Sequence, residues 1–292
     1  MGGLGRLLAA HRPLPGARGS PRAGGLAMNL GASAIVLRPR PLSEILDLAC
    51  RLSMSLALGL YARLSAILFL PMLAGCLALR HAAGWSWLEV WGVAIALGGV
   101  AQGVFTVAVG RLLFSEELSA GQVLRLFKAR LSSYLWMLFL SRLLLAAAAL
   151  PMFLGLPLAW PRLVFVHEAS LLEAARAGDA IQRSSRFVTG RVAAVLGALI
   201  ALLLAQAGIA LTAELLGQSL VDAILQLGKP FGALLDDGGS PFALAGFFAG
   251  IPYVATARFL HYIDARTRAD GWDIQLRFLA IAAREGEKRA AA

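Results

Sequence analysis

The sequence predicts an all-α integral membrane protein, with six transmembrane helices arranged as three hairpins and both termini in the cytoplasm. Three observations support this. The 292-residue chain is 59% hydrophobic and 15% charged, whereas soluble domains carry about 25% charged residues. Its apolar residues form runs close to the length of about 20 residues that crosses a bilayer. Its basic residues lie between these runs, mostly on one predicted side.

The predicted spans cover residues 56–79, 87–110, 131–149, 151–166, 192–211 and 241–257. As one helix, 131–166 would measure about 54 Å, too long for a single crossing. Because Pro151 and Pro157 interrupt helical hydrogen bonding near its middle, we predict a tight hairpin of two short spans there. The loop 212–240 has a helical apolar pattern, which predicts an amphipathic helix along the outer interface.

The topology follows from the basic residues. With six spans, the cytoplasmic side carries 22 Lys and Arg residues and the opposite side two. Five spans would place one arginine-rich terminus outside. Positive charge is retained in the cytoplasm, so we expect a bacterial inner (plasma) membrane protein whose partners are the lipid bilayer and anionic lipid headgroups. No aromatic-basic surface of the kind that binds nucleic acid is present.

The domain organisation is simple. Residues 1–34 are predicted to form a disordered, basic N-terminal tail, because they are rich in glycine, proline and arginine and have no acidic residue. Met28 is an alternative translation start. Residues 35–280 form the predicted six-helix membrane domain, and 281–292 form a disordered C-terminal tail.

A short basic amphipathic segment precedes each predicted pair of spans. The string ARLS occurs at 62–65 and again at 129–132, and Gly190-Arg191-Val192 stands at the matching point of the third pair. Two interpretations remain open. The segments are an internal repeat, which many transporters have, or they are similar only because all basic amphipathic segments have a similar composition.

Two arginines, Arg142 and Arg162, lie within the predicted broken hairpin. A charged arginine at the centre of a bilayer costs about 2.5–3.5 kcal/mol on insertion scales. One interpretation is that they line a polar cavity or an anion site. The other is that their long side chains reach the interface.

The sequence contains no catalytic motif that would indicate an enzyme, and no cofactor or metal is expected. It has no nucleophile elbow and no phosphate-binding loop. The two cysteines, Cys50 and Cys76, suggest neither a disulfide framework nor a metal site. The pair Gly99 and Gly103, like Gly246 and Gly250, has the spacing that allows close helix contact.

Three segments carry a family resemblance: LRPRPLSEILDLACRL at 37–52, AIQRSSRFVTGR at 180–191 and YIDARTRADGWDIQLR at 262–277. In this order they resemble the membrane-domain family associated with glycerophosphoryl diester phosphodiesterases. In that family the hydrolytic chemistry belongs to a separate soluble domain fused in some members, so the resemblance implies no enzyme activity here. The residues that match the family are Glu44, Asp47, Arg183, Ser184, Tyr262, Asp264, Arg266, Trp272 and Asp273.

We expect these residues to form a polar layer at the cytoplasmic face. Glu44 and Asp47 share one helix face, and the arginines at 183, 266 and 268 are expected to pair with them and with Asp264. The first functional hypothesis is therefore a non-catalytic protein that anchors, scaffolds or regulates a membrane or cytoplasmic protein partner at this face. The alternative is a small-solute transporter or permease component that uses the broken hairpin 131–166.

Overall fold

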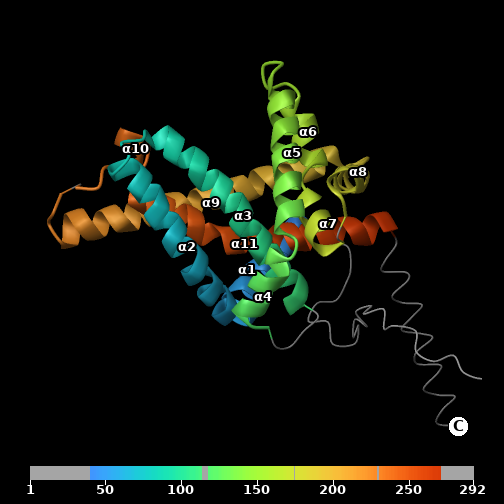
Figure 1. Ribbon diagram of the computed structural model, residues 1–292, viewed down its shortest axis with the longest axis horizontal. Coiled ribbons are helices and arrows are strands. Elements are labelled where there is room, and N and C mark those ends of the chain that lie inside the picture. The colour runs from blue at the N-terminus through green and yellow to red at the C-terminus, as the bar shows by residue number, and fades with distance from the viewer. Residues whose placement is uncertain (1–39, 114–117, 174, 229, 271–292) are drawn as a thin grey trace, which may run out of the picture.

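The computed structural model describes residues 40–113, 118–173, 175–228 and 230–270, in which every regular element is a helix (Figure 1). The predicted tails, 1–34 and 281–292, lie outside the described residues. The helices are α1 Leu42–Arg51, α2 Leu58–His81, α3 Trp87–Leu112, α4 Ala120–Lys128, α5 Leu131–Ala149, α6 Leu156–Arg162, α7 Val166–Leu172, α8 Ala177–Val188, α9 Val192–Ser219, α10 Leu234–Asp237 and α11 Pro241–Asp270. Two π-helical segments, Leu52–Leu56 and Leu220–Ile224, follow α1 and α9.

Five of the described helices are long and apolar enough to cross a membrane: α2, α3, α5, α9 continued to Ile224, and α11. They correspond to the first, second, third, fifth and sixth predicted spans and support the all-α membrane class. Two of them, α9 and α11, extend furthest past the predicted ends. The fifth predicted span ends at residue 211 but α9 continues, and the sixth ends at 257 whereas α11 reaches Asp270.

The predicted fourth span, 151–166, is not one helix, so this predicted crossing has no long helix of its own among the described residues. Turns occupy its start, where Met152 and Phe153 have positive φ angles of 49° and 63°. The seven residues of α6 make a helix of only about 10 Å, and further turns separate it from α7. Pro157 suits the first turn of α6, but Pro161 removes a second backbone donor. The returning arm of the α5 hairpin is therefore broken into α6 and α7.

The short helices α1, α4 and α8 are the predicted amphipathic segments, and each directly precedes a long helix. α1 runs into α2 through a π-helical segment, whereas α4 and α8 end in turns, the second with Gly190 at φ 78°. The two ARLS strings are not equivalent in structure. Arg130 lies just before α5, while Arg63 lies in the second turn of α2.

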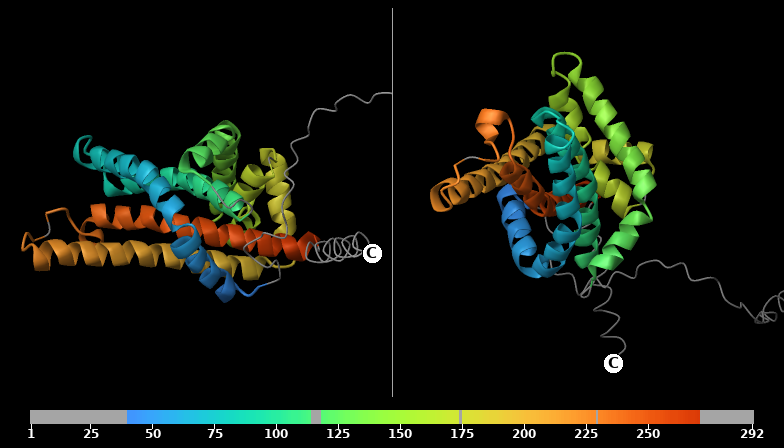
Figure 2. Two further views of the ribbon diagram at one scale, coloured as in Figure 1. Left: turned by 90° about the horizontal axis from the view of Figure 1, so that it is seen from below. Right: turned by 60° about the vertical axis from the view of Figure 1, so that its left-hand side comes forward.

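The helices α9 and α11 run side by side, and α3 packs against α11 (Figure 2). Glycine allows this approach, because a Cβ atom on Gly246 would lie 2.8 Å from the Cα of Ala210 and 3.0 Å from the carbonyl oxygen of Ile209. Gly250 faces the side chain of Gln206 in the same way. The predicted packing role of this glycine pair is therefore confirmed.

The core between α2, α3 and α11 is aromatic and contains one hydrogen bond between side chains. The rings of Tyr61 and Phe105 meet edge to face with centroids 5.2 Å apart. The hydroxyl of Tyr61 hydrogen-bonds Thr256 on α11 at 2.7 Å. Phe69 stacks on Phe248 of α11 at 5.7 Å. These contacts hold the α2–α3 pair against the α9–α11 pair.

The predicted amphipathic helix in 212–240 is in part a continuation of α9 to Ile224, and only four residues of α10 form a separate helix there. Glu214 near the end of α9 is 6% exposed. Its carboxylate accepts hydrogen bonds from the backbone N–H of Leu234 at 2.9 Å and from Gln218 at 3.2 Å. The hydroxyl of Ser240 also donates to it. This carboxylate closes the loop against the end of the bundle.

Candidate functional site

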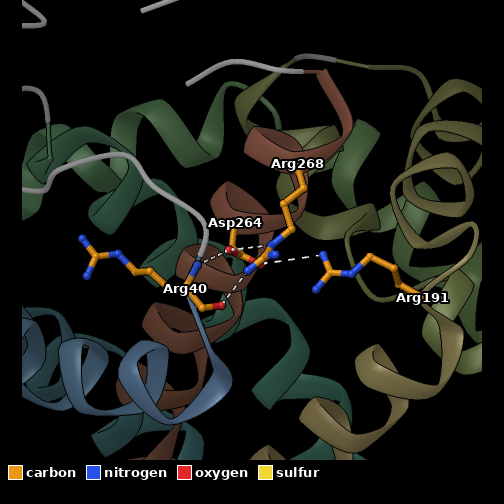
Figure 3. Close-up of polar contacts among 4 residues, drawn as sticks. All are labelled: Arg40, Arg191, Asp264 and Arg268. Carbon is orange, nitrogen blue, oxygen red and sulfur yellow. Dashed lines mark hydrogen bonds and ion pairs between the residues drawn. The ribbon is translucent and has the colours of Figure 1, made fainter. Parts of the chain in front are cut away.

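Asp264, near the end of α11, is the centre of one ionic cluster (Figure 3). Its carboxylate is 3% exposed and accepts a hydrogen bond from Arg268 Nε at 2.9 Å. The backbone N–H of Arg40 donates to it at 2.8 Å, and Arg191 Nη1 lies 3.8 Å away. Arg268 also donates to the carbonyl of Arg40 at 2.9 Å. The cluster joins the end of α11 to the segments that begin α1 and α9.

Glu173, which follows α7, is the centre of a second ionic cluster. Arg183 on α8 pairs with its carboxylate, and Arg266 Nη1 on α11 lies 3.1 Å from it. The hydroxyl of Tyr262 donates a hydrogen bond to the same carboxylate. Three of the predicted polar-layer residues therefore meet at an acid that the family resemblance did not include.

The remaining residues of the predicted layer are dispersed. Ser184 is buried and accepts a hydrogen bond of 3.0 Å from a backbone N–H just before α7. Glu44 and Asp47 each form an ion pair with an arginine four positions away in the chain. Trp272 and Asp273 lie outside the described residues. Only part of the layer is thus brought together, by contacts that join the chain's own helices.

A cavity of about 220 Å³ lies at the mid-height of the long helices, between α3, α5, α6, α9 and α11. Most of its wall is apolar. Its polar groups are the guanidinium groups of Arg142 and Arg258 and the side-chain amides of Gln102 and Gln206. Its other lining residues are Ile95, Gly98, Gly99, Trp160, Leu199, Leu202, Leu203, Phe247, Ile251 and Val254.

Two neighbouring glycines on α3 make room for this cavity. A Cβ atom on Gly99 would lie 3.9 Å from Arg142 Nη2, and one on Gly98 would touch the ring of Phe247 at 3.0 Å. Two apolar lining residues, Ile95 and Leu203, are 53% and 55% exposed on the outside of the bundle. The cavity therefore opens sideways, between α3 and α9.

Of the two arginines predicted within the membrane, only Arg142 lines this cavity. Arg142 has no hydrogen-bond or ion-pair partner among the residues that the structure describes. Arg162 is exposed and donates a hydrogen bond of 2.8 Å to the carbonyl of Leu158 in its own helix. Arg142 lies about 16 Å along α5 from its beginning and about 10 Å from its end, so its Cα lies within the helix and not at either end.

Arg258 on α11 is the second cation of the cavity. It donates a hydrogen bond to the carbonyl of Val164, and its Nε lies 3.7 Å from Oε1 of Glu168 on α7. This is an ion pair without a hydrogen bond, since 3.7 Å is too long for one. Glu168 is fully buried.

Tyr134 and His167 form a buried polar pair beside the two arginines. The hydroxyl of Tyr134 donates to the carbonyl of Gly99 at 2.7 Å and lies 2.7 Å from Nδ1 of His167. A hydroxyl has one proton, so Nδ1–H of His167 must donate to Tyr134. The pair joins α3, α5 and α7 beside the two arginines.

Sequence reasoning missed most of this site. It placed Arg258 and Glu168 beyond the ends of spans, and it gave no role to Gln102 or Gln206. The signal that was available is an amide within a long apolar run, at 102 and again at 206. In the described part of the chain, no three His, Cys, Asp or Glu side chains are close enough together to hold a metal ion.

The site can attract and hold an anion. Two guanidinium groups face the cavity and one carboxylate, Glu168, faces one of them, which leaves an excess of positive charge when that carboxylate is ionised. Arginine presents fixed N–H donors that match the oxygens of carboxylate, sulfonate or phosphate groups. No family model, curated protein or solved structure matches this chain. The family resemblance of the three segments thus stays a prediction, and the interpretation of the site depends on its geometry alone.

Proposed function

We propose that this protein is a membrane carrier that binds a small organic anion in the cavity at Arg142 and Arg258. The observation on which the proposal depends is the unpaired guanidinium of Arg142 facing this cavity. Charged side chains within a membrane protein are expensive and mark ligand or ion pathways. A cavity reaching Arg142 favours the transporter hypothesis over that of a purely scaffolding protein, whose bundle would be dry and closely packed.

The wall of the cavity defines the class of solute. Its volume of about 220 Å³ is below the usual range of about 300–1,000 Å³ for small-molecule sites, so the solute is small. The guanidinium and amide groups suit an oxyanion, and the leucine, isoleucine and tryptophan side chains suit an apolar body. The expected ligand is an oxyanion attached to a small apolar group.

The proposed topology places this cavity near the bilayer centre. The five long helices cross the membrane, and the broken arm α6–α7 is the sixth, interrupted crossing. Both termini then lie in the cytoplasm of a bacterial inner membrane, on the side that receives most basic residues. Interrupted helices and midplane binding sites are features that transporters share.

A second candidate function is the anchoring of a partner at the cytoplasmic face. It is favoured by the outward-facing basic side chains of the short helices, Arg51 on α1, Arg125 and Lys128 on α4, and Arg183 and Arg186 on α8. These side chains suit anionic lipid headgroups as well as an acidic protein surface. Crosslinking in native membranes tests this function. We expect a partner protein to crosslink to wild type, and we expect this crosslink to disappear when these basic side chains are changed to alanine.

The carrier function is tested by uptake of benzenesulfonate into phosphatidylcholine vesicles that contain the purified protein. This probe is an oxyanion on an apolar ring, and it is permanently ionised, so it does not leak through lipid as a neutral acid. We expect uptake well above that of protein-free vesicles. The variant Gly99→Leu, whose side chain grows into the cavity, should abolish the uptake.

The matched control is Gly92→Leu on the same helix, where nothing lies within 4 Å of an added Cβ atom. It should transport as wild type does. Inhibition by added phosphatidylglycerol would identify an anionic lipid as the natural occupant, which could reach the cavity through its side opening. Uptake that equals that of empty vesicles would overturn the proposal.

A further inference from the structure

Glu168 is an unusual carboxylate for this environment. Its side chain is fully buried, and neither carboxylate oxygen accepts a hydrogen bond from another described residue. Its cation is Arg258, whose Nε is also without a hydrogen bond. Buried acids are normally held by several donors, so the charge of Glu168 is balanced mainly by one guanidinium at 3.7 Å.

Arg258 is shared between Glu168 and the cavity. Its guanidinium lines the cavity of about 220 Å³ and also a smaller one of about 20 Å³ that includes His167 and Arg142. An oxyanion in the larger cavity would bind Arg258, whereas Glu168 does not line that cavity. Two negative charges would then compete for one cation inside the protein.

The other groups around Glu168 do not replace this cation. The phenol groups of Tyr134 on α5 and Tyr262 on α11 carry no charge near pH 7, because a phenol ordinarily ionises near about 10. On α7 itself, Nδ1–H of His167 is held by Tyr134, and Glu173, just after α7, belongs to the ionic cluster with Arg183 of α8. A carboxylate that loses its cation inside a protein is strongly destabilising unless it takes up a proton.

We propose that binding of the anion is coupled to protonation of Glu168, so that the carrier moves one proton together with each monovalent anion. The inference rests on the proposed function of the cavity. In the empty state Glu168 is ionised and pairs with Arg258. When the anion binds Arg258, the carboxylate of Glu168 accepts a proton from the aqueous solution and becomes a neutral acid. The charge of the site is unchanged by the two events together, so transport is electroneutral.

Proton uptake on binding tests the coupling directly. Purified wild-type protein in weakly buffered detergent solution, with a pH indicator, is titrated with benzenesulfonate, which does not itself titrate. We expect about one proton to be taken up for each anion bound. The affinity should weaken by up to about tenfold for each unit of rising pH.

Two variants separate the role of Glu168 from that of other acids. Glu168→Gln mimics the protonated acid, so it should bind the anion with no proton uptake and with an affinity independent of pH. Asp179→Asn, at an exposed position on α8 away from the cavity, should take up protons as wild type does. If Glu168→Gln does not fold, wild type still shows whether a proton is taken up, and Glu168→Asp, which keeps an acid at this position, should retain that uptake.

The two proposals fail in different ways. If wild type binds no benzenesulfonate at any pH, the proposed function is wrong. If wild type binds it with no proton uptake and no dependence on pH, the cavity is an anion site and the coupling to Glu168 is wrong. Proton uptake that persists in Glu168→Gln would also overturn the coupling.

Discussion

Replacement of Arg142 by methionine should weaken anion binding and at the same time leave the protein as stable as before or more so. Its guanidinium has no partner among the described residues, so the variant breaks no protein contact that a stable fold needs. A charge-assisted hydrogen bond contributes about 1.5–3 kcal/mol. Since about 1.4 kcal/mol corresponds to a tenfold change, we expect benzenesulfonate to bind about 10- to 100-fold more weakly.

The stability change has the opposite sign. Removal of a charge from the middle of a span relieves part of a penalty of about 2.5–3.5 kcal/mol, and methionine keeps much of the length of the side chain. Calorimetric titration of the detergent-purified protein gives the affinity, and a thermal melt gives the midpoint. The matched control, Arg162→Met, removes an exposed arginine bonded only to its own helix and should change neither quantity. Binding that Arg142→Met leaves unchanged would refute the reasoning.

Three further predictions concern residues outside the cavity: a packing glycine, an ionic cluster and the buried tyrosine–histidine pair. Gly246→Val should lower the melting temperature by several degrees, because its Cβ meets the α9 backbone at 2.8 Å; Gly208→Val, with open space around it, should not. Asp264→Asn should cost about 1.5–3 kcal/mol of stability in chemical unfolding, since it weakens the charge-assisted hydrogen bonds that the buried carboxylate accepts from Arg268 and from the backbone of Arg40, whereas the exposed pair of Asp47 is worth under about 1 kcal/mol. Nitrogen NMR at pH 7 should show a proton on Nδ1 of His167, because the hydroxyl of Tyr134 already donates its proton to Gly99; an unprotonated Nδ1 would contradict this.

Hydropathy was sufficient to find the long helices but not their ends. A hydropathy scale detects the apolar part of a helix, so a span assigned from it ends at the first charged residue even where the helix continues. The sixth predicted span therefore ends at 257, one residue before Arg258, whereas α11 continues to Asp270. An arginine that the sequence assigned to a loop is for this reason a cation of the cavity. Arg142 was found because it is flanked by apolar residues on both sides.

The broken arm shows a second limit of sequence reasoning. Pro151 and Pro157 correctly predicted a break after residue 149, because proline removes a helical hydrogen bond. They did not predict that Pro161 and the turns after it would also divide the segment that follows α5 into the two short helices α6 and α7. The division turns α7 against α3, α5 and α8, which is what brings Glu168 to Arg258. Such a placement depends on tertiary contacts that no local pattern contains.

The ionic clusters were predicted in kind but not in pairing. The chain's acids and arginines near the ends of α1, α8 and α11 indicated a charged layer, and Asp264 with Arg268 is one of the expected pairs. Arg183 and Arg266 meet at Glu173, which is over 80 positions away from Arg266. Ion-pair partners at such separations follow from the packing of helices, so the sequence could name the participants but not their partners.

A carrier of this kind must hold an oxyanion between Arg142 and Arg258. A structure of the protein with 4-iodobenzenesulfonate, located by the anomalous scattering of iodine, tests it most directly. We predict an iodine peak against the apolar wall of the cavity, with the sulfonate toward the two guanidinium groups. A saturated complex with no iodine in the cavity would contradict the account.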